Sequence, residues 1–195
     1  MVSPTLLTSE HEVAPLVQDE HLYEIVDGRR VDVPPMSVYT TWLASRLQSR
    51  LGPYVEEHGL GTCVMEMLFI LDAERNLRRR PDVAFVSAER WPLDREIPTT
   101  GDWDIVPDLA VEVISPNDLF QDVITKLHEY FHYGVRLVWA VVPEVQQVYV
   151  YDSPTQVHIL TVRDTLTGGK ILPDFHLPLA SLFQRSASTR VVPGS

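Results

Sequence analysis

The chain has 195 residues, of which 45% are hydrophobic and 22% charged, so it can bury one sizeable core and we expect a single domain. Its formal net charge of −11 disfavours a protein that coats nucleic acid nonspecifically, because basic side chains supply most of that affinity. A lone cysteine, Cys63, excludes a disulfide framework and a cysteine-rich zinc module and favours a cytoplasmic setting, and no apolar run approaches the ~20 residues needed to cross a bilayer.

The clearest signal in the N-terminal third is a β-hairpin. Two runs with alternating apolar residues, 22–26 and 29–33, flank Asp27-Gly28. This dipeptide is typical of a tight two-residue turn between antiparallel strands. We therefore predict a hairpin in which Glu24 lies on the first strand.

The segment 37–80 is predicted to form a helix, a strand and a polar connection. Apolar residues recur every three or four positions from 37 to 58, which indicates one amphipathic helix. Gly52-Pro53 lies inside that pattern, so a kink or a break is expected there. The stretch 62–71 has the composition of a strand, and Arg78-Arg79-Arg80 follows in the connection. A run of this kind is usually a solvated turn and less often a phosphate contact.

Two carboxylates belong to strands that are otherwise apolar. Asp82 stands at the first position of a short predicted strand, where an aspartate after proline commonly does no more than cap a loop. Glu112 interrupts the apolar run 109–114, and a carboxylate is rarely buried unless a cation, a proton or a hydrogen-bond donor compensates it. Alternation of side chains along the strand places Glu112 on the same face as Ala110 and opposite Val113.

A helix should follow the strand of Glu112. The turn 115–118 offers N-cap side chains, and the helix is expected to run to Tyr133 and end at Gly134. Its predicted apolar stripe consists of Phe120, Val123, Ile124, Leu127 and Phe131. Lys126 lies beside this stripe and can either pair with Asp122 in solvent or reach over the end of the sheet. The solvent position is the commoner one for such a lysine.

The remaining elements extend the sheet beyond this crossover unit. We predict strands at 137–142, 146–151 and 157–162, a short strand or turn near Ile171, and a helix at 179–183. The last two of the three strands should form an antiparallel hairpin. We assign residues 1–183 to one domain and the small, polar residues 184–195 to a flexible C-terminal tail.

Asp82, Glu112 and Lys126 form a set with a common chemistry. A hard cation such as Mg²⁺ binds one or two carboxylates, a carbonyl and waters, lowers the pKa of an attacking water and stabilises charge on a phosphoryl group. A nearby lysine would hold the nucleophile and neutralise the phosphoryl oxygens. The reaction that this trio suits is hydrolysis of a phosphodiester.

The order of Pro81-Asp82, Glu112-Val113-Ile114 and Lys126 resembles the PD-(D/E)XK nuclease superfamily and, within it, the bacterial putative restriction endonuclease family. Further matching stretches are YEIVDG at 23–28, RPDVAFV at 80–86, PDLAVEVISP at 107–116, KLHEYFHYGV at 126–135 and VYVYD at 148–152. The resemblance implies a restriction-endonuclease-like α/β fold, in which helices flank a mixed β-sheet and a β-hairpin stands at the N-terminus.

The same resemblance implies a metal-dependent endonuclease that uses Mg²⁺ or Mn²⁺. Asp82 and Glu112 would be the metal acids, and the backbone carbonyl of Val113 a further ligand. Glu24 belongs to the Tyr-Glu pair of the family and is a candidate supporting acid. The implied partners are a nucleic-acid substrate, with DNA favoured, and a second copy of the chain in a homodimer, with no membrane.

The lysine of the superfamily departs from its usual place. It should follow Glu112 by two residues, but this chain has Ile114 there. We expect Lys126, on the next helix, to be its migrated substitute.

A rival enzyme motif lies on the same helix. His128-Glu129-Tyr130-Phe131-His132 spells H-E-x-x-H, whose two histidines would share a helical face and could bind zinc while the glutamate activates water. The predicted helix ends two residues later, and His158 and His176 are isolated candidates for a third ligand. A zinc metalloprotease is therefore less favoured than two surface histidines.

A third possibility is a catalytically inactive nuclease fold that serves as a binding or oligomerisation module. The missing lysine and the charge of −11 fit it. The presence of both acids favours the nuclease, because a carboxylate in an apolar strand is costly to keep.

Overall fold

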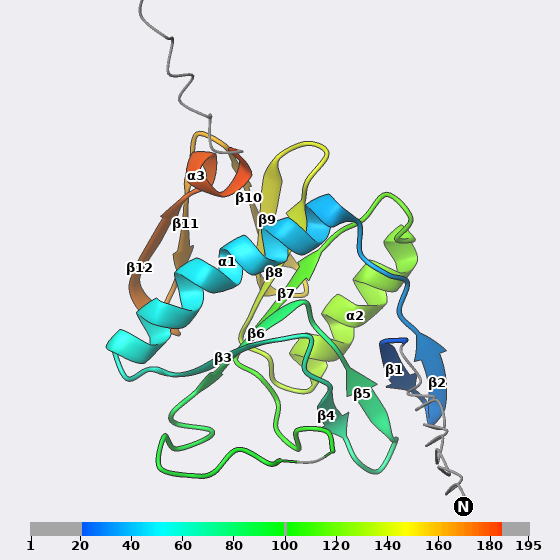
Figure 1. The fold of residues 1–195 in the computed structure, drawn as a ribbon. Coiled ribbons are helices and arrows are strands. Elements are labelled where there is room, and N and C mark those ends of the chain that lie inside the picture. The colour runs from blue at the N-terminus through cyan, green and yellow to red at the C-terminus, as the bar shows by residue number, and fades with distance from the viewer. Residues whose placement is uncertain (1–20, 100, 185–195) are drawn as a thin grey trace, which may run out of the picture.

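The computed structural model describes residues 21–99 and 101–184, so the predicted tail, apart from Gln184, lies outside the described residues. A six-stranded sheet in the order β10-β9-β8-β7-β6-β3 forms its centre (Figure 1). The strands are β3 (Gly61–Met65), β6 (Val83–Ser87), β7 (Leu109–Val113), β8 (Leu137–Val142), β9 (Gln147–Ser153) and β10 (Gln156–Thr161). β7 and β8 run parallel and the other neighbours antiparallel, as the predicted crossover and hairpin require.

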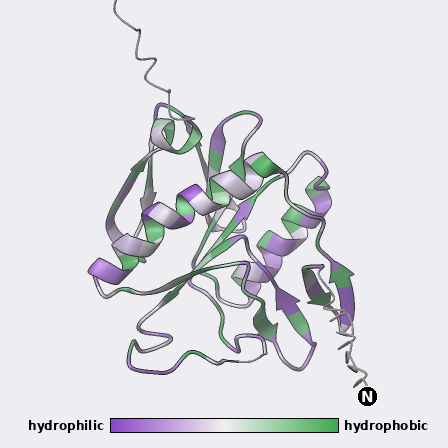
Figure 2. Cartoon of the chain, in the orientation of Figure 1, coloured by the Kyte–Doolittle hydropathy of each residue, from purple (hydrophilic) through white to green (hydrophobic). Residues whose placement is uncertain are grey.

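Helices and smaller sheets cover both faces of this sheet. One face carries α1 (Val38–Glu57), α3 (Leu179–Phe183) and the two-stranded sheet of β11 (Thr165–Gly168) and β12 (Leu172–Pro178). The other face carries α2 (Phe120–His132) and a four-stranded antiparallel sheet, β2-β1-β5-β4. Figure 2 shows that both long helices alternate hydrophobic and hydrophilic residues along their length, as helices with one buried side do. The predicted α/β fold is confirmed.

Alternation along β7 decides which residues face which layer. Leu109, Val111 and Val113 belong to the core under α1, whereas Ala110 belongs to the core under α2. Glu112 therefore faces α2, because it has the same parity as Ala110.

The four-stranded sheet consists of β1 (Tyr23–Val26), β2 (Arg29–Asp32), β4 (Phe69–Asp72) and β5 (Leu77–Arg79). The predicted hairpin of β1 and β2 is confirmed. Asp27 and Gly28 both have positive φ, 48° and 75°, which a type I′ turn requires. The hairpin adds to β5 through β1 and so lies beside the N-terminal half of α2.

Of the kink or break expected at Gly52-Pro53, the break was wrong, since α1 is one helix from Val38 to Glu57. Proline removes the backbone bond to the carbonyl of Ser49. Leu51 and Val55 on either side are fully buried against the central sheet, and this packing keeps the helix continuous.

Two further expectations were wrong between α1 and β6. The predicted strand 62–71 is split into β3 and β4, which belong to different sheets, and Glu66 between them has a φ of 49°. The arginine run is not a solvated turn, because Arg78 and Arg79 form part of β5 and Arg79 is buried.

The start of α2 also differs from the prediction. Asp118 accepts a hydrogen bond from the backbone N–H of Ser115 and so closes the preceding turn instead of capping the helix. Leu119 is the N-cap and has no side-chain cap bond. Phe120, assigned above to the apolar stripe, is 80% exposed. Of the helices in the described ranges, none has the length and apolarity that crossing a bilayer requires.

Candidate active site

A cleft of about 540 Å³ opens at the carboxyl end of β7, between the β1–β2 hairpin and α2. Ligand sites of open α/β sheets are commonly found at the carboxyl ends of strands. Glu24, Asp82, Glu112 and Lys126 all line this cleft. Side chains from β1, β7, α2 and the residue before β6, all chosen above on sequence grounds, therefore meet in one place.

Glu112 lies at the floor of the cleft, with its side chain held by α2. Tyr130 donates its hydroxyl to Oε1 at 2.6 Å, and Lys126 Nζ lies 3.4 Å from Oε2. Burial raises the pKa of Glu112, and the charge of Glu24 raises it further, whereas Lys126 and the Tyr130 hydrogen bond act in the opposite direction. The net shift of the pKa is upward, because the effect of burial is the largest of these.

Asp82 immediately precedes β6 and stands opposite Glu112, because Val83 pairs with Val111 in the antiparallel register. Its Oδ2 accepts a hydrogen bond from the backbone N–H of Val113 at 2.5 Å. Burial, followed by the charge of Glu112, raises the pKa of Asp82 to about 8. Within the described residues no donor bonds its second oxygen, Oδ1.

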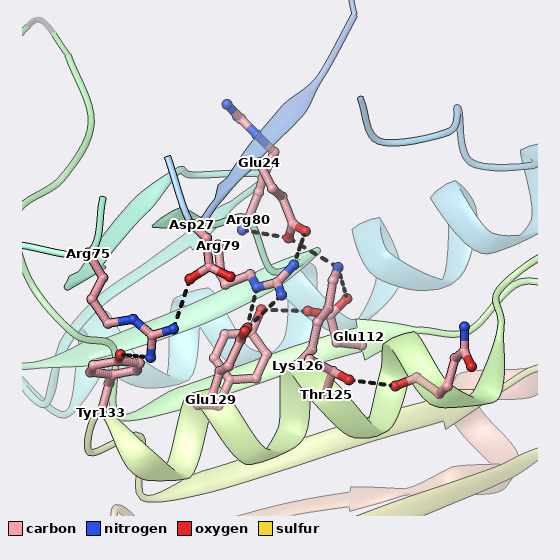
Figure 3. A network of polar contacts seen from close by, with 12 residues as sticks. Glu24, Asp27, Arg75, Arg79, Arg80, Glu112, Thr125, Lys126, Glu129 and Tyr133 are labelled. Atoms are coloured by element: carbon pink, nitrogen blue, oxygen red, sulfur yellow. Dashed lines mark hydrogen bonds and ion pairs between the residues drawn. The ribbon is translucent and has the colours of Figure 1, made fainter. Parts of the chain in front are cut away.

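Lys126 reaches the acids instead of solvent. Its Nζ lies 3.1 Å from Oε1 of Glu24 and 3.4 Å from Oε2 of Glu112 (Figure 3). The solvent position favoured above was thus wrong, and the alternative of reaching over the end of the sheet was right. Burial alone would lower the pKa of Lys126, but the charges of Glu112 and Glu24 outweigh it and raise the pKa. The ammonium stays protonated through neutral pH.

Glu24 is buried and joins the lysine to a second cation. Its Oε2 accepts from Arg79 at 2.7 Å, and its Oε1 accepts from the backbone N–H of Arg80 at 3.0 Å. Burial would raise the pKa of Glu24, but Lys126 and Arg79 outweigh it, and the net shift is downward. Glu24 is therefore an ionised acid that holds Lys126 in place.

The chain of ion pairs continues from Arg79 to Glu129 on α2, at 2.6 Å (Figure 3). Glu129 is the glutamate of the H-E-x-x-H motif, and this pairing engages the carboxylate that would have to activate a zinc-bound water. His128 and His132 are exposed and line a separate hollow with Arg75 and Tyr133. Within residues 21–99 and 101–184, no group of three or more His, Cys, Asp or Glu side chains is placed to hold a metal.

The residues that sequence reasoning missed are Tyr130 and Arg79. Tyr130 follows Lys126 by four positions and so shares its helical face, and a buried tyrosine usually has a partner for its hydroxyl. That spacing is a signal that could have found it. Arg79 had no such signal, because its partners come from β1 and α2.

Asp82 and Glu112 are a pair of acids, and the donor set around them suits a hard cation. The N–H of Val113 points to Asp82, while that of Ile114 points to the other side, to Val141 of β8. In a strand the N–H and C=O of one residue point to the same side, so the carbonyl of Val113 faces Asp82 as well. Two carboxylates, one carbonyl and room for water are what Mg²⁺ or Mn²⁺ accepts. These residues could hold such a cation.

Comparisons of the sequence and the fold with known proteins also indicate a nuclease-like protein. The family model Uma2, described as "Putative restriction endonuclease", matches residues 9–180. The fold is similar to the crystal structure of a putative nuclease belonging to DUF820 from Anabaena variabilis ATCC 29413, with a TM-score of 0.71 and 18% identity over 83% of this chain and 89% of that one. No curated protein matched the sequence.

Proposed function

The chain belongs to the Uma2 family, whose description is putative restriction endonuclease, and from that premise we propose that it is a divalent-metal-dependent phosphodiester hydrolase that acts as a DNA endonuclease. Both the matching family and the crystal structure of similar fold are described as nucleases. The metal, the substrate and the roles of individual residues are the content of this proposal.

The observation that carries it is the surplus of carboxylates at the end of β7. Glu24, Asp82 and Glu112 line one cleft, where Lys126 is the cation shared between two of them. Arg79 balances Glu24 but is itself shared with Glu129. A site of this composition binds a divalent cation favourably, because buried like charges repel until a cation neutralises them.

We assign the metal to Asp82, Glu112 and the carbonyl of Val113. When bound, Mg²⁺ or Mn²⁺ would stabilise charge on the phosphoryl oxygens and lower the pKa of the attacking water. Asp82 would turn its unbonded Oδ1 to the cation while Oδ2 stays fixed by the backbone of Val113. Glu112 stays oriented by Tyr130.

Lys126 acts as an electrostatic group in this proposal. Since its pKa is raised, it is a poor proton acceptor at neutral pH and cannot serve as the general base. A protonated ammonium beside the two metal acids can position the water and neutralise charge that develops in the transition state. Glu24 and Arg79 hold it there. Lys126 thus replaces the lysine absent at Ile114.

A cleavage assay tests the proposal. Supercoiled plasmid and single-stranded DNA are incubated with the protein and Mg²⁺ or Mn²⁺, beside an EDTA control and the variant Asp82→Asn. We expect cleavage that needs the metal and is lost in the variant. Light scattering tests the homodimer, which would place two cleavage sites in one particle.

The inactive nuclease-fold module predicts a different result. Wild type and Asp82→Asn would then behave alike with every substrate, although both fold and bind. Cleavage that persists in EDTA, or equal cleavage by both proteins, would count against metal-dependent hydrolysis at this site.

A further inference from the structure

The three consecutive arginines at 78–80 differ in what neutralises their charge. Arg78 is ion-paired with Asp102, and Arg79 is ion-paired with the two acids described above. Arg80 donates only to backbone carbonyls and forms no ion pair with a carboxylate of the residues that the structure describes. Since a guanidinium keeps its proton at neutral pH, Arg80 adds a positive charge that no acid beside it cancels.

The side chain of Arg80 is nevertheless held in place. Its Nε donates to the carbonyl of Tyr23 at 3.1 Å, and its Nη1 donates to the carbonyl of Glu66. Carbonyls orient the guanidinium without removing its charge. A guanidinium has five N–H donors, so both N–H groups of Nη2 stay available, with no acceptor from the described ranges. A charged fork that is already oriented suits an anion with several oxygens.

Arg80 lines the same cleft as the metal acid Asp82. The residue before a proline favours an extended backbone, and Arg80 precedes Pro81, so Arg80 and Asp82 are about 7 Å apart along the chain. Of the other described cations that line this cleft, Lys126 and Arg79 are paired with acids. Arg80 is therefore the cation of the cleft that can take an anion from outside.

We propose that Arg80 binds a backbone phosphate that flanks the scissile one, and thereby positions the nucleic-acid strand at the metal acids. This inference rests on the proposed function, which takes one phosphate to Asp82 and Glu112. A strand carries a charge at every linkage, so the phosphate at the acids has charged neighbours on the same strand. The planar fork of an arginine can donate to two oxygens of one phosphate.

The acids of the cleft make this one cation important. Asp32, Asp118 and Asp122 also line the cleft and repel a phosphate. A strand that enters it has to be held against that repulsion, and Arg80 is the cation available for it. A purely structural role would account for the two carbonyl bonds of Arg80. The test therefore needs a readout that depends on a phosphate.

Binding measured without cleavage supplies that readout. Fluorescence anisotropy with a labelled DNA duplex and, separately, a labelled single strand, in Ca²⁺ instead of Mg²⁺, compares the full chain with Arg80→Gln. We expect the variant to bind roughly 10- to 100-fold more weakly, the range for loss of one charge-assisted contact. The slope of log affinity against log salt should become shallower by about 0.9 for the duplex or about 0.7 for the single strand, as for one phosphate.

Two further variants control for charge and for structure. Arg80→Lys retains the charge and should keep the wild-type salt slope. Arg50→Gln removes the same charge from an exposed position on α1 that does not line the cleft, and its affinity should stay close to that of wild type. Melting curves of all variants show whether each one is folded at the temperature of the titration.

DNA strands with one neutral methylphosphonate linkage, moved along the strand, locate the contact. At one position the neutral linkage should weaken binding of the wild type about as much as Arg80→Gln does. The variant should lose nothing further at that position, because the two changes remove the same contact. A structural arginine would give additive losses at every position.

The inference is overturned if neither probe binds in Ca²⁺, if Arg80→Gln keeps the wild-type salt slope, or if no methylphosphonate position distinguishes the variant from wild type. Its failure differs from that of the proposed function. Cleavage that depends on Asp82 while Arg80→Gln binds normally would leave the nuclease intact and refute the phosphate contact. Binding that depends on Arg80 without metal-dependent cleavage would keep the phosphate contact and refute the nuclease.

Discussion

Strand β7 has a carboxylate near each end, Asp108 and Glu112, and the two differ in what surrounds them. Asp108, just before the strand, is fully buried and accepts a hydrogen bond from the N–H of Ser87 at 2.7 Å. The Nε atoms of Arg90 and Arg136 lie 3.0 and 3.1 Å from its Oδ1, as ion pairs whose angles fall short of aligned hydrogen bonds. Two cations therefore contact this one acid, although Arg136 is shared with the exposed Glu89.

At the other end of β7, acids outnumber the cations that contact them. Glu112 shares Lys126 with Glu24, and Asp82 stands opposite with a pKa raised to about 8. The difference teaches that burial of an acid does not by itself mark a functional site. What distinguishes Glu112 from Asp108 is the deficit of positive charge, which a bound cation can supply.

The largest expected effect is on cleavage, from a substitution of Glu112. Glu112→Gln should lower the cleavage rate at least about 10³-fold, because loss of one metal acid removes several kcal/mol of transition-state stabilisation. The amide oxygen still accepts from Tyr130, so the thermal midpoint should stay close to that of wild type. Initial rates in Mg²⁺ and a melting curve check both points, and near-normal cleavage would refute the metal assignment.

The next largest effect is on stability, from a substitution of Asp108. Asp108→Asn leaves Arg90 without its anion and Arg136 with only the exposed Glu89, and it should lower the free energy of unfolding by about 3 kcal/mol. For a chain of this size that corresponds to roughly 6–12 °C in the thermal midpoint. Urea unfolding measures the loss. At a temperature where the variant is folded, its cleavage rate should equal that of wild type, and a selective loss of cleavage would mean that both ends of β7 serve the chemistry.

Tyr130→Phe sharpens the comparison, since it removes the donor to Glu112 and changes little volume. Groups that orient a metal ligand commonly contribute 10- to 100-fold to metal affinity or rate, so we expect a loss in that range. Titration with Mg²⁺ should show a higher half-saturating concentration. The matched control is Tyr133→Phe, at the C-cap of the same helix and outside the cleft. Equal behaviour of the two variants would remove Tyr130 from the site.

The smallest effect concerns pH. In the unfolded chain Asp82 loses its proton near its ordinary pKa of 3.8, whereas the folded protein keeps it to about 8. The folded state therefore binds more protons in that window, and stability should fall as pH rises from about 4 to about 8. We expect a change on the order of 1 kcal/mol, since the cleft is open to solvent.

Urea midpoints at several pH values, measured in EDTA, check this prediction. Asp82→Asn has no proton to lose and should flatten the profile across the window. Added Mg²⁺ should restore stability at the alkaline end, because it binds the ionised form. Identical profiles for the variant and wild type would show that Asp82 does not carry the shifted pKa.

Much of the candidate site was predictable because it depends on local patterns. A period of two along β7 placed Glu112 opposite Val113, and the strand, turn and helix signals placed Asp82, Glu112 and Lys126 on successive elements. The hairpin turn at Asp27-Gly28 needs positive φ at both residues, which the dipeptide accepts. Such signals act over a few residues, where sterics and side-chain periodicity dominate.

The tertiary structure alone decided how these elements face one another. Lys126 turned to the acids because α2 packs with its Tyr130 face on β7, which a local pattern cannot show. Arg79 and Glu24 were each ambiguous in sequence and became a buried pair across 55 positions. Pairing between distant segments depends on which hydrophobic faces meet. The charge balance that separates Glu112 from Asp108 therefore exists only once the sheet and its two layers have assembled.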